Sequence, residues 1–79
     1  MAINRKYKVR TYAPHGEVLD WLHANVGPTL VSQPVIFWRG HDWIMIGGHE
    51  QHDEETGRHY NEVGFDDQKI AFWFSLQWS

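Results

Sequence analysis

This sequence of 79 residues lacks cysteine and any long apolar run. Without cysteine there is neither a disulfide framework nor a zinc site built from thiolates, and such a composition suits a reducing cytosol. A membrane-spanning helix needs a run of about 18 apolar residues, and none is present. The first residues, Met-Ala-Ile-Asn-Arg-Lys, also lack the apolar segment of a secretory signal. We therefore expect one domain over residues 1–79, located in the cytoplasm and not in a membrane.

Basic residues are scarce outside the start of the chain. Four of the seven lie among the first ten positions, whereas seven of the ten acidic residues lie between positions 49 and 67. The formal net charge is −3. An acidic chain binds the phosphate backbone of nucleic acid poorly, so nucleic acid is a disfavoured partner.

Large aromatic residues are abundant, and two of the five tryptophans lie in the stretch Val35–Gly48. Its β-prone runs on both sides of Gly40-His41 predict a hairpin with a two-residue type II′ turn, in which the glycine has a positive φ. This turn pairs Arg39 with Asp42 and Trp38 with Trp43. Alternation along each strand makes both faces of the hairpin apolar, with Trp38, Trp43, Ile36 and Met45 on one face and Phe37, Ile44, Val35 and Ile46 on the other.

The preceding and following segments predict a helix and two further strands. Residues 6–12 alternate basic and apolar side chains, as an edge strand does. Residues 14–26 have apolar side chains at helical spacing, and we expect Gly27 to end this helix as a left-handed cap. Trp21 of this helix is predicted to pack on the sheet. Loops are expected at 28–34 and 49–58, and a strand near 58–65.

The C-terminal segment, residues 66–78, fits either a strand or a helix. A helix would begin at Asp66 as its N-cap. A strand would place alternate apolar residues on one face, namely Ile70, Phe72, Phe74, Leu76 and Trp78. The residues alone slightly favour the strand.

A resemblance favours the helix instead. The hairpin, the stretch Val63–Ala71 and the residues Phe74, Leu76 and Trp78 resemble a group of small, uncharacterised proteins encoded by phages and prophages. These proteins combine a tryptophan-rich hairpin, a strand ending in Phe-Asp or Phe-Glu, and a closing Ala-x-x-Phe-x-Leu-x-Trp. The resemblance implies a short helix from about Asp66 to Phe74, followed by an extended tail. It implies no function.

Together these segments predict an α+β fold, in which one or two helices pack on an antiparallel sheet of three or four strands. The order of elements is similar to a split β-α-β, ferredoxin-like arrangement. Helix 14–26 would cover one face of the 35–48 hairpin. The other face would be covered by residues 66–78 or would remain free for binding.

No residue pattern indicates catalysis, so we expect a non-enzymatic protein without a cofactor. The adjacent carboxylates at 54–55 and 66–67 have no partner nucleophile. Among six histidines, the sharpest candidates for metal ligands are His49, His52 and His59. The spacing His49-x-x-His52 is one residue short of the zincin pattern, and a polar loop holds ligands poorly. We therefore expect no metal site.

The sequence hypothesis is a small, phage-encoded protein that binds and inhibits a host protein, such as a nucleic-acid enzyme or a CRISPR defence complex. An acidic surface can mimic nucleic acid and enter a basic groove. The predicted contact residues are Trp38, Trp43, Glu50, Asp53, Glu54 and Glu55. The alternatives are a self-assembling phage protein that forms a homodimer through the hairpin or a sheet edge, and a metal- or nucleic-acid-binding domain.

Overall fold

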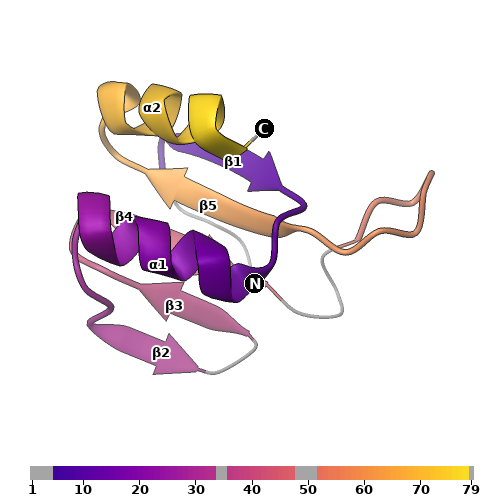
Figure 1. Cartoon of the computed structure of the whole chain (residues 1–79), viewed down its shortest axis with the longest axis horizontal. Helices are drawn as coiled ribbons and strands as arrows, with labels where there is room; N and C mark the ends of the chain where they lie inside the picture. The colour runs from indigo at the N-terminus through magenta and orange to yellow at the C-terminus, as the bar shows by residue number, and fades with distance from the viewer. Residues whose placement is uncertain (1–4, 34–35, 48–51, 79) are drawn as a thin grey trace.

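The computed structural model describes residues 5–33, 36–47 and 52–78 of the chain. Within these ranges the chain forms five strands and two helices: β1 (Tyr7–Thr11), α1 (His15–Asn25), β2 (Val31–Gln33), β3 (Phe37–Arg39), β4 (Trp43–Ile46), β5 (Asn61–Phe65) and α2 (Gln68–Trp78). Figure 1 shows the strands side by side in one sheet, with the helices in front of it.

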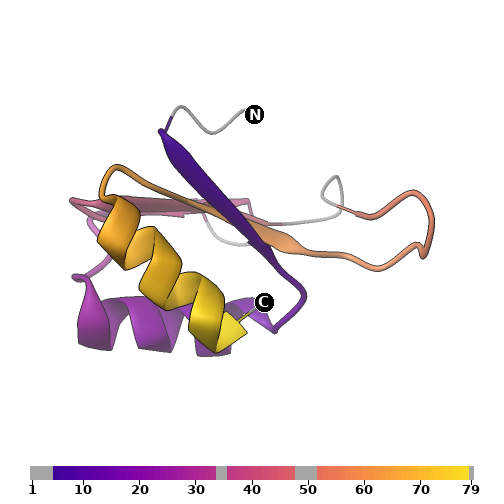
Figure 2. The same ribbon diagram turned by 90° about the horizontal axis from the view of Figure 1, so that it is seen from above.

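The sheet has the strand order β1-β5-β4-β3-β2, and every neighbouring pair is antiparallel. Four antiparallel steps bring β1 and β2 into the same direction at opposite edges. Helix α1 connects these two edges, and β2 to β5 then return across the sheet as a meander. Both helices lie on one face of the sheet (Figure 2), where α2 packs on β1 and β5.

The predicted α+β class is confirmed, and the sheet has one more strand than expected. The additional strand is β2, within the segment 28–34 that was predicted to be a loop. Its three residues are too few to show a clear alternation, and pairing with β3 is what makes them a strand. The topology differs from a split β-α-β unit in one respect, because three strands separate the parallel strands β1 and β2.

The hairpin of β3 and β4 forms, but its register differs from the prediction. Trp38 pairs with Met45, and Arg39 pairs with Ile44. The backbone N–H of Gly40 donates to the carbonyl of Trp43 at 2.9 Å, so the two-residue turn is His41-Asp42. The predicted register was therefore wrong by two residues. A shift of two leaves every side chain on its predicted face, whereas a shift of one would reverse them all.

The core lies between the sheet and the two helices. It consists of Trp38, Trp43, Met45, Val63 and Phe65 from the sheet, Val18 and Leu22 from α1, and Ala71 and Phe74 from α2. Because both helices lie on the same face, α2 does not cover the second face of the hairpin, which was one of the predicted arrangements. Trp21 packs mainly between the helices, with ring centroids 5.0 Å from Trp73 and 5.5 Å from Phe74.

Both helices end or begin differently from the prediction. Gly27 does not have a positive φ, and its N–H and that of Val26 both donate to the carbonyl of Leu22. At the start of α2, the side chain of Asp67 accepts a hydrogen bond from the N–H of Lys69 at 2.8 Å, so the N-cap is Asp67 and not Asp66. The helix predicted for 66–74 is present but continues to Trp78, in place of the extended tail.

Candidate protein-binding surface

Helix α2 has large apolar side chains on both its inner and its outer side. Its inner side packs into the fold through Ile70, Ala71, Phe74 and Trp78. On the opposite side Phe72, Trp73 and Leu76 are 64%, 48% and 70% exposed. We call these three residues the outer face of α2. A surface helix normally has a polar outer side, and a helix that is apolar all round is normally covered on both sides.

Helix α1 provides the comparison within the same molecule. It buries Val18 and Leu22, and its solvent side is formed by small or polar residues: Gly16, Glu17, Asp20, His23, Ala24 and Asn25. The two helices have the same length of 11 residues and pack on the same face of one sheet. The apolar exterior is therefore a property of α2 and not a general consequence of this fold.

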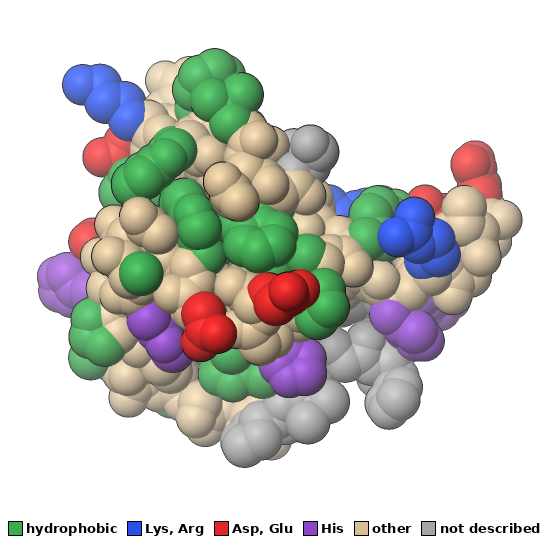
Figure 3. All heavy atoms as spheres, in the orientation of Figure 1, with side chains coloured by type: hydrophobic (Ala, Val, Ile, Leu, Met, Phe, Trp, Pro, Cys, Tyr) green, Lys and Arg blue, Asp and Glu red, His purple; other side chains and the backbone are tan. Residues whose placement is uncertain are grey.

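The apolar surface continues from α2 towards α1 through Trp21. The indoles of Trp21 and Trp73 meet edge to face, which fixes the orientation of the half-exposed Trp73. Figure 3 shows hydrophobic side chains over α2 and in the region between the helices, with acidic side chains over α1. Near α2, exposed charge is supplied by Lys69, by the N-cap Asp67 and by the Arg5–Asp66 ion pair. The surface is thus an apolar centre with a polar border, as in protein–protein interfaces.

The tryptophans predicted as contact residues do not belong to this surface. Trp43 is fully buried and Trp38 is 8% exposed. The ring of His15 stacks on Trp38 at 5.2 Å, and the indole N–H of Trp43 donates to the carbonyl of Gly27 at 3.1 Å. The prediction that these side chains meet a partner was therefore wrong, because α1 and the segments next to it cover that face of the hairpin.

The other face of the hairpin mixes apolar with charged side chains. Ile44 lies between Arg39 and Gly64 across the strands, and Ile46 lies between Phe37 and Glu62. Lys8 and Arg10 continue these two rows on β1. An antiparallel sheet commonly presents such a mixed face to solvent, so this face is a weaker candidate than the outer face of α2.

Residues 52–60 form a hairpin arm, where the sequence indicated a loop without regular structure. The N–H of Asp53 donates to the carbonyl of Arg58 at 2.8 Å, and the N–H of Gly57 donates to the carbonyl of Asp53 at 2.7 Å. Gly57 has a φ of 73°, which a turn of this kind requires and glycine adopts without strain. The arm projects beyond the sheet in Figures 1 and 2. The spacing of Asp53 and Gly57 is the sequence signal that predicts such a turn.

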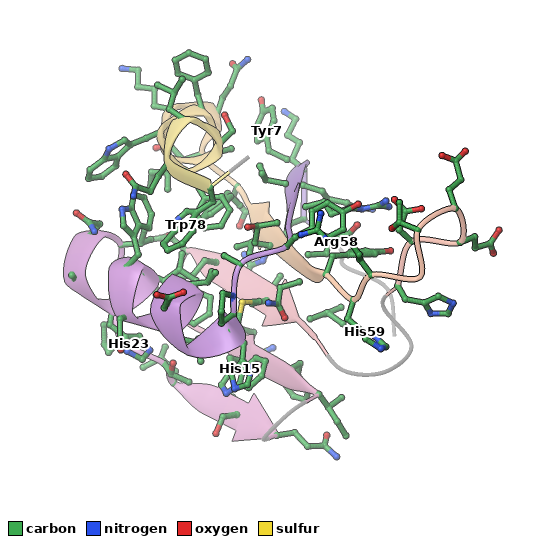
Figure 4. The ribbon with its side chains drawn as sticks, turned by 45° about the vertical axis from the view of Figure 1, so that its right-hand side comes forward. Tyr7, His15, His23, Arg58, His59 and Trp78 are labelled. Carbon is green, nitrogen blue, oxygen red and sulfur yellow. The ribbon has the colours of Figure 1, made fainter. Side chains whose placement is uncertain are left out.

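Stacked arginine and tyrosine side chains attach the arm to the body of the protein. The guanidinium of Arg58 lies 4.4 Å from the ring of Tyr12, and that of Arg10 lies 3.9 Å from the ring of Tyr60. The two tyrosine rings meet edge to face at 6.1 Å. Figure 4 shows Arg58 and His59 on the arm, far from His23 of α1. These contacts give the arm a defined position relative to the sheet.

The predicted acidic contacts have different surroundings. Asp53 accepts hydrogen bonds from the N–H of Glu55 and from the hydroxyl of Tyr12, both at 2.9 Å. These two bonds, in that order of importance, lower the pKa of Asp53, and Arg10 contributes less. Glu54 and Glu55 are exposed at the tip. Glu50 lies outside the described residues. Asp53 therefore stabilises the arm, and Glu54 and Glu55 remain as candidate contacts.

The histidines give no support to a metal site. His52 and His59 face each other across the arm with ring centroids 6.0 Å apart, and His49 lies outside the described residues. In the part of the chain that the structure describes, no three His, Cys, Asp or Glu side chains are grouped so as to hold a metal ion.

No protein-family model, curated protein or solved structure matches this chain. None of the helices in the described ranges is long and apolar enough to cross a membrane.

The outer face of α2 was missed in the sequence because residues 66–78 also fit a strand. In a strand, Phe72 and Leu76 would share a face with Phe74 and would all be buried together. Placed on a helix, the same residues cannot all face the sheet. The signal was available once the helix was accepted, since only Gln68, Lys69, Ser75 and Gln77 of α2 are polar.

Proposed function

We propose that this protein is non-enzymatic and acts by binding another protein through the outer face of α2. The observation that carries the proposal is that Phe72, Trp73 and Leu76 are exposed together on one side of a helix whose other side is anchored in the core. Large aromatic side chains held in a fixed orientation are typical centres of binding energy in interfaces. The helix is held at its end as well, since the hydroxyl of Thr11 donates to the carbonyl of Trp78 at 3.1 Å.

The size of the outer face of α2 allows an estimate of the binding free energy that it can supply. Burying a large apolar side chain contributes about 1.5–3 kcal/mol, so three side chains that are half to two-thirds exposed supply roughly 3–5 kcal/mol. A micromolar complex requires about 8 kcal/mol. The outer face is therefore the centre of an interface, and further contacts around it, with Trp21 and Lys69 as the nearest candidates, would complete it.

A narrower form of the proposal is that the protein is phage-encoded and inhibits a host protein, such as a nuclease of a defence system. It is supported by the resemblance of the hairpin and C-terminal residues to small phage proteins, and by the exposed acids Glu54 and Glu55 at the tip of the arm. The base of the same arm carries positive charge, since Arg58 and Arg10 stack on Tyr12 and Tyr60, so the arm supplies a local acidic contact and not a long acidic surface.

Matched substitutions on the two helices test the proposal. Leu76→Glu on α2 and Ala24→Glu on α1 each place a glutamate at an exposed helical position. The tagged wild-type protein and both variants would be used for affinity capture from cells of the native host. We expect the wild type and Ala24→Glu to retain the same partner and Leu76→Glu to lose it. Equal recovery by all three proteins would contradict a role for the outer face of α2.

A second pair of substitutions tests the narrower form. Glu54→Lys combined with Glu55→Lys reverses the charge at the arm tip without altering Asp53. If electrostatic steering by the arm contributes, this variant should bind the captured partner with a slower association rate and a weaker dependence on salt. Unchanged association kinetics would remove the arm from the proposal and leave the outer face of α2 as its basis.

A further inference from the structure

The two edges of the sheet differ in charge. Strand β1 forms one edge and carries Lys8 and Arg10, whose side chains are exposed. Strand β2 forms the other edge, and all three of its residues are exposed. The sequence contains no charged residue from Ala24 to Trp38. Charged side chains on an edge strand normally prevent pairing with other chains, and β2 lacks this protection.

Exposed apolar side chains accompany this uncharged edge. Leu30 is 63% exposed, Val31 is 40% exposed and Ile36 is 44% exposed. Leu30 directly precedes β2, and the N–H of Ile36 donates to the carbonyl of Gln33 at the other end of the strand. A strand added beside β2 would therefore lie next to exposed apolar side chains at both ends of this edge.

We infer that β2 is an association site for a second copy of this chain, which pairs with it antiparallel about a two-fold axis. The two five-stranded sheets would then form one continuous sheet. A copy of the same edge suits this site because it is also uncharged, so the net charge of −3 causes little repulsion where the strands meet. Pairing of β2 with the β1 edge of another copy is disfavoured, since it would desolvate Lys8 and Arg10. A two-fold pair also closes, whereas β2-to-β1 pairing would continue into fibres.

The backbone specifies the register of this pair. The N–H groups of Gly40 and Gly47 donate to the carbonyls of Trp43 and Ile36, so alternate residues of β3 direct their backbone groups to β4. The residues between them, Phe37 and Arg39, direct theirs to β2. Val31 pairs with Arg39 and Gln33 pairs with Phe37, so the N–H and carbonyl of Ser32 point away from β3. With the two-fold axis at Ser32, the two Ser32 residues exchange hydrogen bonds, and Val31 pairs with Gln33 of the other copy.

This association does not compete with the proposed function. Helix α2 packs on β1 and β5, at the opposite end of the sheet from β2 (Figure 1). A dimer formed through β2 would present two outer faces of α2, one at each end of the continuous sheet. The inference is therefore independent of whether α2 binds another protein.

The absence of cysteine allows a direct test by cross-linking. Ser32→Cys introduces a single thiol at the axis, where the two Cα atoms of a hydrogen-bonded pair lie about 5.5 Å apart, within the range for a disulfide. Lys8→Cys is the control, since it places a thiol on the other exposed edge. We expect Ser32→Cys to form covalent dimers at least about tenfold faster than Lys8→Cys under mild oxidation, a ratio that corresponds to roughly 1.4 kcal/mol. Equal rates would overturn the inference.

Sedimentation of the cysteine-free protein supplies a second measurement. We expect the wild type to dimerise at micromolar concentration. Ser32→Lys should weaken the dimer about tenfold or more, because it places two like charges opposite each other. Near-ultraviolet circular dichroism would show that the variant is folded, and Gln33→Lys provides a second substitution on the same edge. A monomeric wild type, or a dimer that survives both substitutions and is lost in Leu76→Glu, would overturn the inference.

Discussion

The indole of Trp43 lies directly against the backbone of Gly40. A Cβ atom at position 40 would be 2.2 Å from Nε1 and 2.5 Å from Cε2 of Trp43, and 2.9 Å from the carbonyl oxygen of Pro28. The indole N–H continues past this point to the carbonyl of Gly27. The missing side chain of Gly40 is thus what allows Trp43 to be fully buried beside the end of α1.

Gly40→Ala should therefore destabilise the fold. The methyl group would displace the Trp43 ring, and overpacking of this kind costs about 1–3 kcal/mol. Urea denaturation followed by tryptophan fluorescence would measure the change. Gly16→Ala is the matched control, because nothing lies within 4 Å of a Cβ at that helical position. It should be neutral or stabilising by about 0.4–1 kcal/mol. Equal stability of the two variants would contradict the packing of Trp43 on Gly40.

The hairpin shows what sequence reasoning could and could not predict. The strands and the face of each side chain follow from local alternation, and the structure has them as predicted. The position of the turn depends on Gly40 and Trp43 meeting across the hairpin, a contact that local turn preferences do not contain. The sequence predicted that glycine is needed at position 40 for a positive φ. In the structure the φ of Gly40 is not positive, and glycine is needed there because Trp43 packs against its backbone.

The two adjacent carboxylates before α2, Asp66 and Asp67, make different contacts. Asp67 accepts the N–H of Lys69, whereas Asp66 pairs with Arg5. Asp67→Ala should lower the free energy of unfolding by about 1 kcal/mol, the usual effect of removing an N-cap. Asp66→Ala removes an exposed ion pair and should cost less, about 0–1 kcal/mol. Chemical denaturation of both variants measures the difference, and a larger loss for Asp66→Ala would show that the helix begins one residue earlier.

The pKa of Asp53 predicts how the arm responds to acid. Because hydrogen bonds to Glu55 and Tyr12 lower this pKa below its ordinary value of 3.8, the ionised carboxylate is favoured in the folded arm. The resulting stabilisation is complete above pH 3.8 and is lost as the pH falls through the lowered pKa. We expect a carboxyl titration by NMR to give a midpoint below 3.8 for Asp53.

Tyr12→Phe tests the cause of that shift. It removes the hydroxyl that donates to Asp53, so the pKa should rise but stay below the ordinary value, because the larger contribution from the Glu55 N–H remains. Tyr7→Phe removes a hydroxyl from β1, the strand that ends directly before Tyr12, and should leave the titration of Asp53 unchanged. An unaltered midpoint in Tyr12→Phe would remove the hydroxyl as a cause.

The C-terminal segment was the least predictable part of the chain. Its alternation fits a strand, and its Asp-Asp start fits a helix. The choice is made by long-range contacts, since Phe74 and Trp78 pack against each other and on the sheet beside Phe65. The candidate surface could not be located without knowing that residues 66–78 form a helix and not a strand. The predicted contacts Trp38 and Trp43 were wrong for the same reason, because burial is decided by which elements meet.

Two phenylalanines of α2 provide the sharpest test of this arrangement. Phe74 is fully buried and Phe72 is mostly exposed, although a strand would place both on one face. Phe74→Ala should cost about 3–5 kcal/mol, and Phe74→Leu less if the alanine variant does not fold. Phe72→Ala should change stability by only about 0.5 kcal/mol. Thermal and urea denaturation of the pair would measure both values. Comparable losses would mean that Phe72 also packs inside, and α2 would then have no apolar outer face to offer a partner.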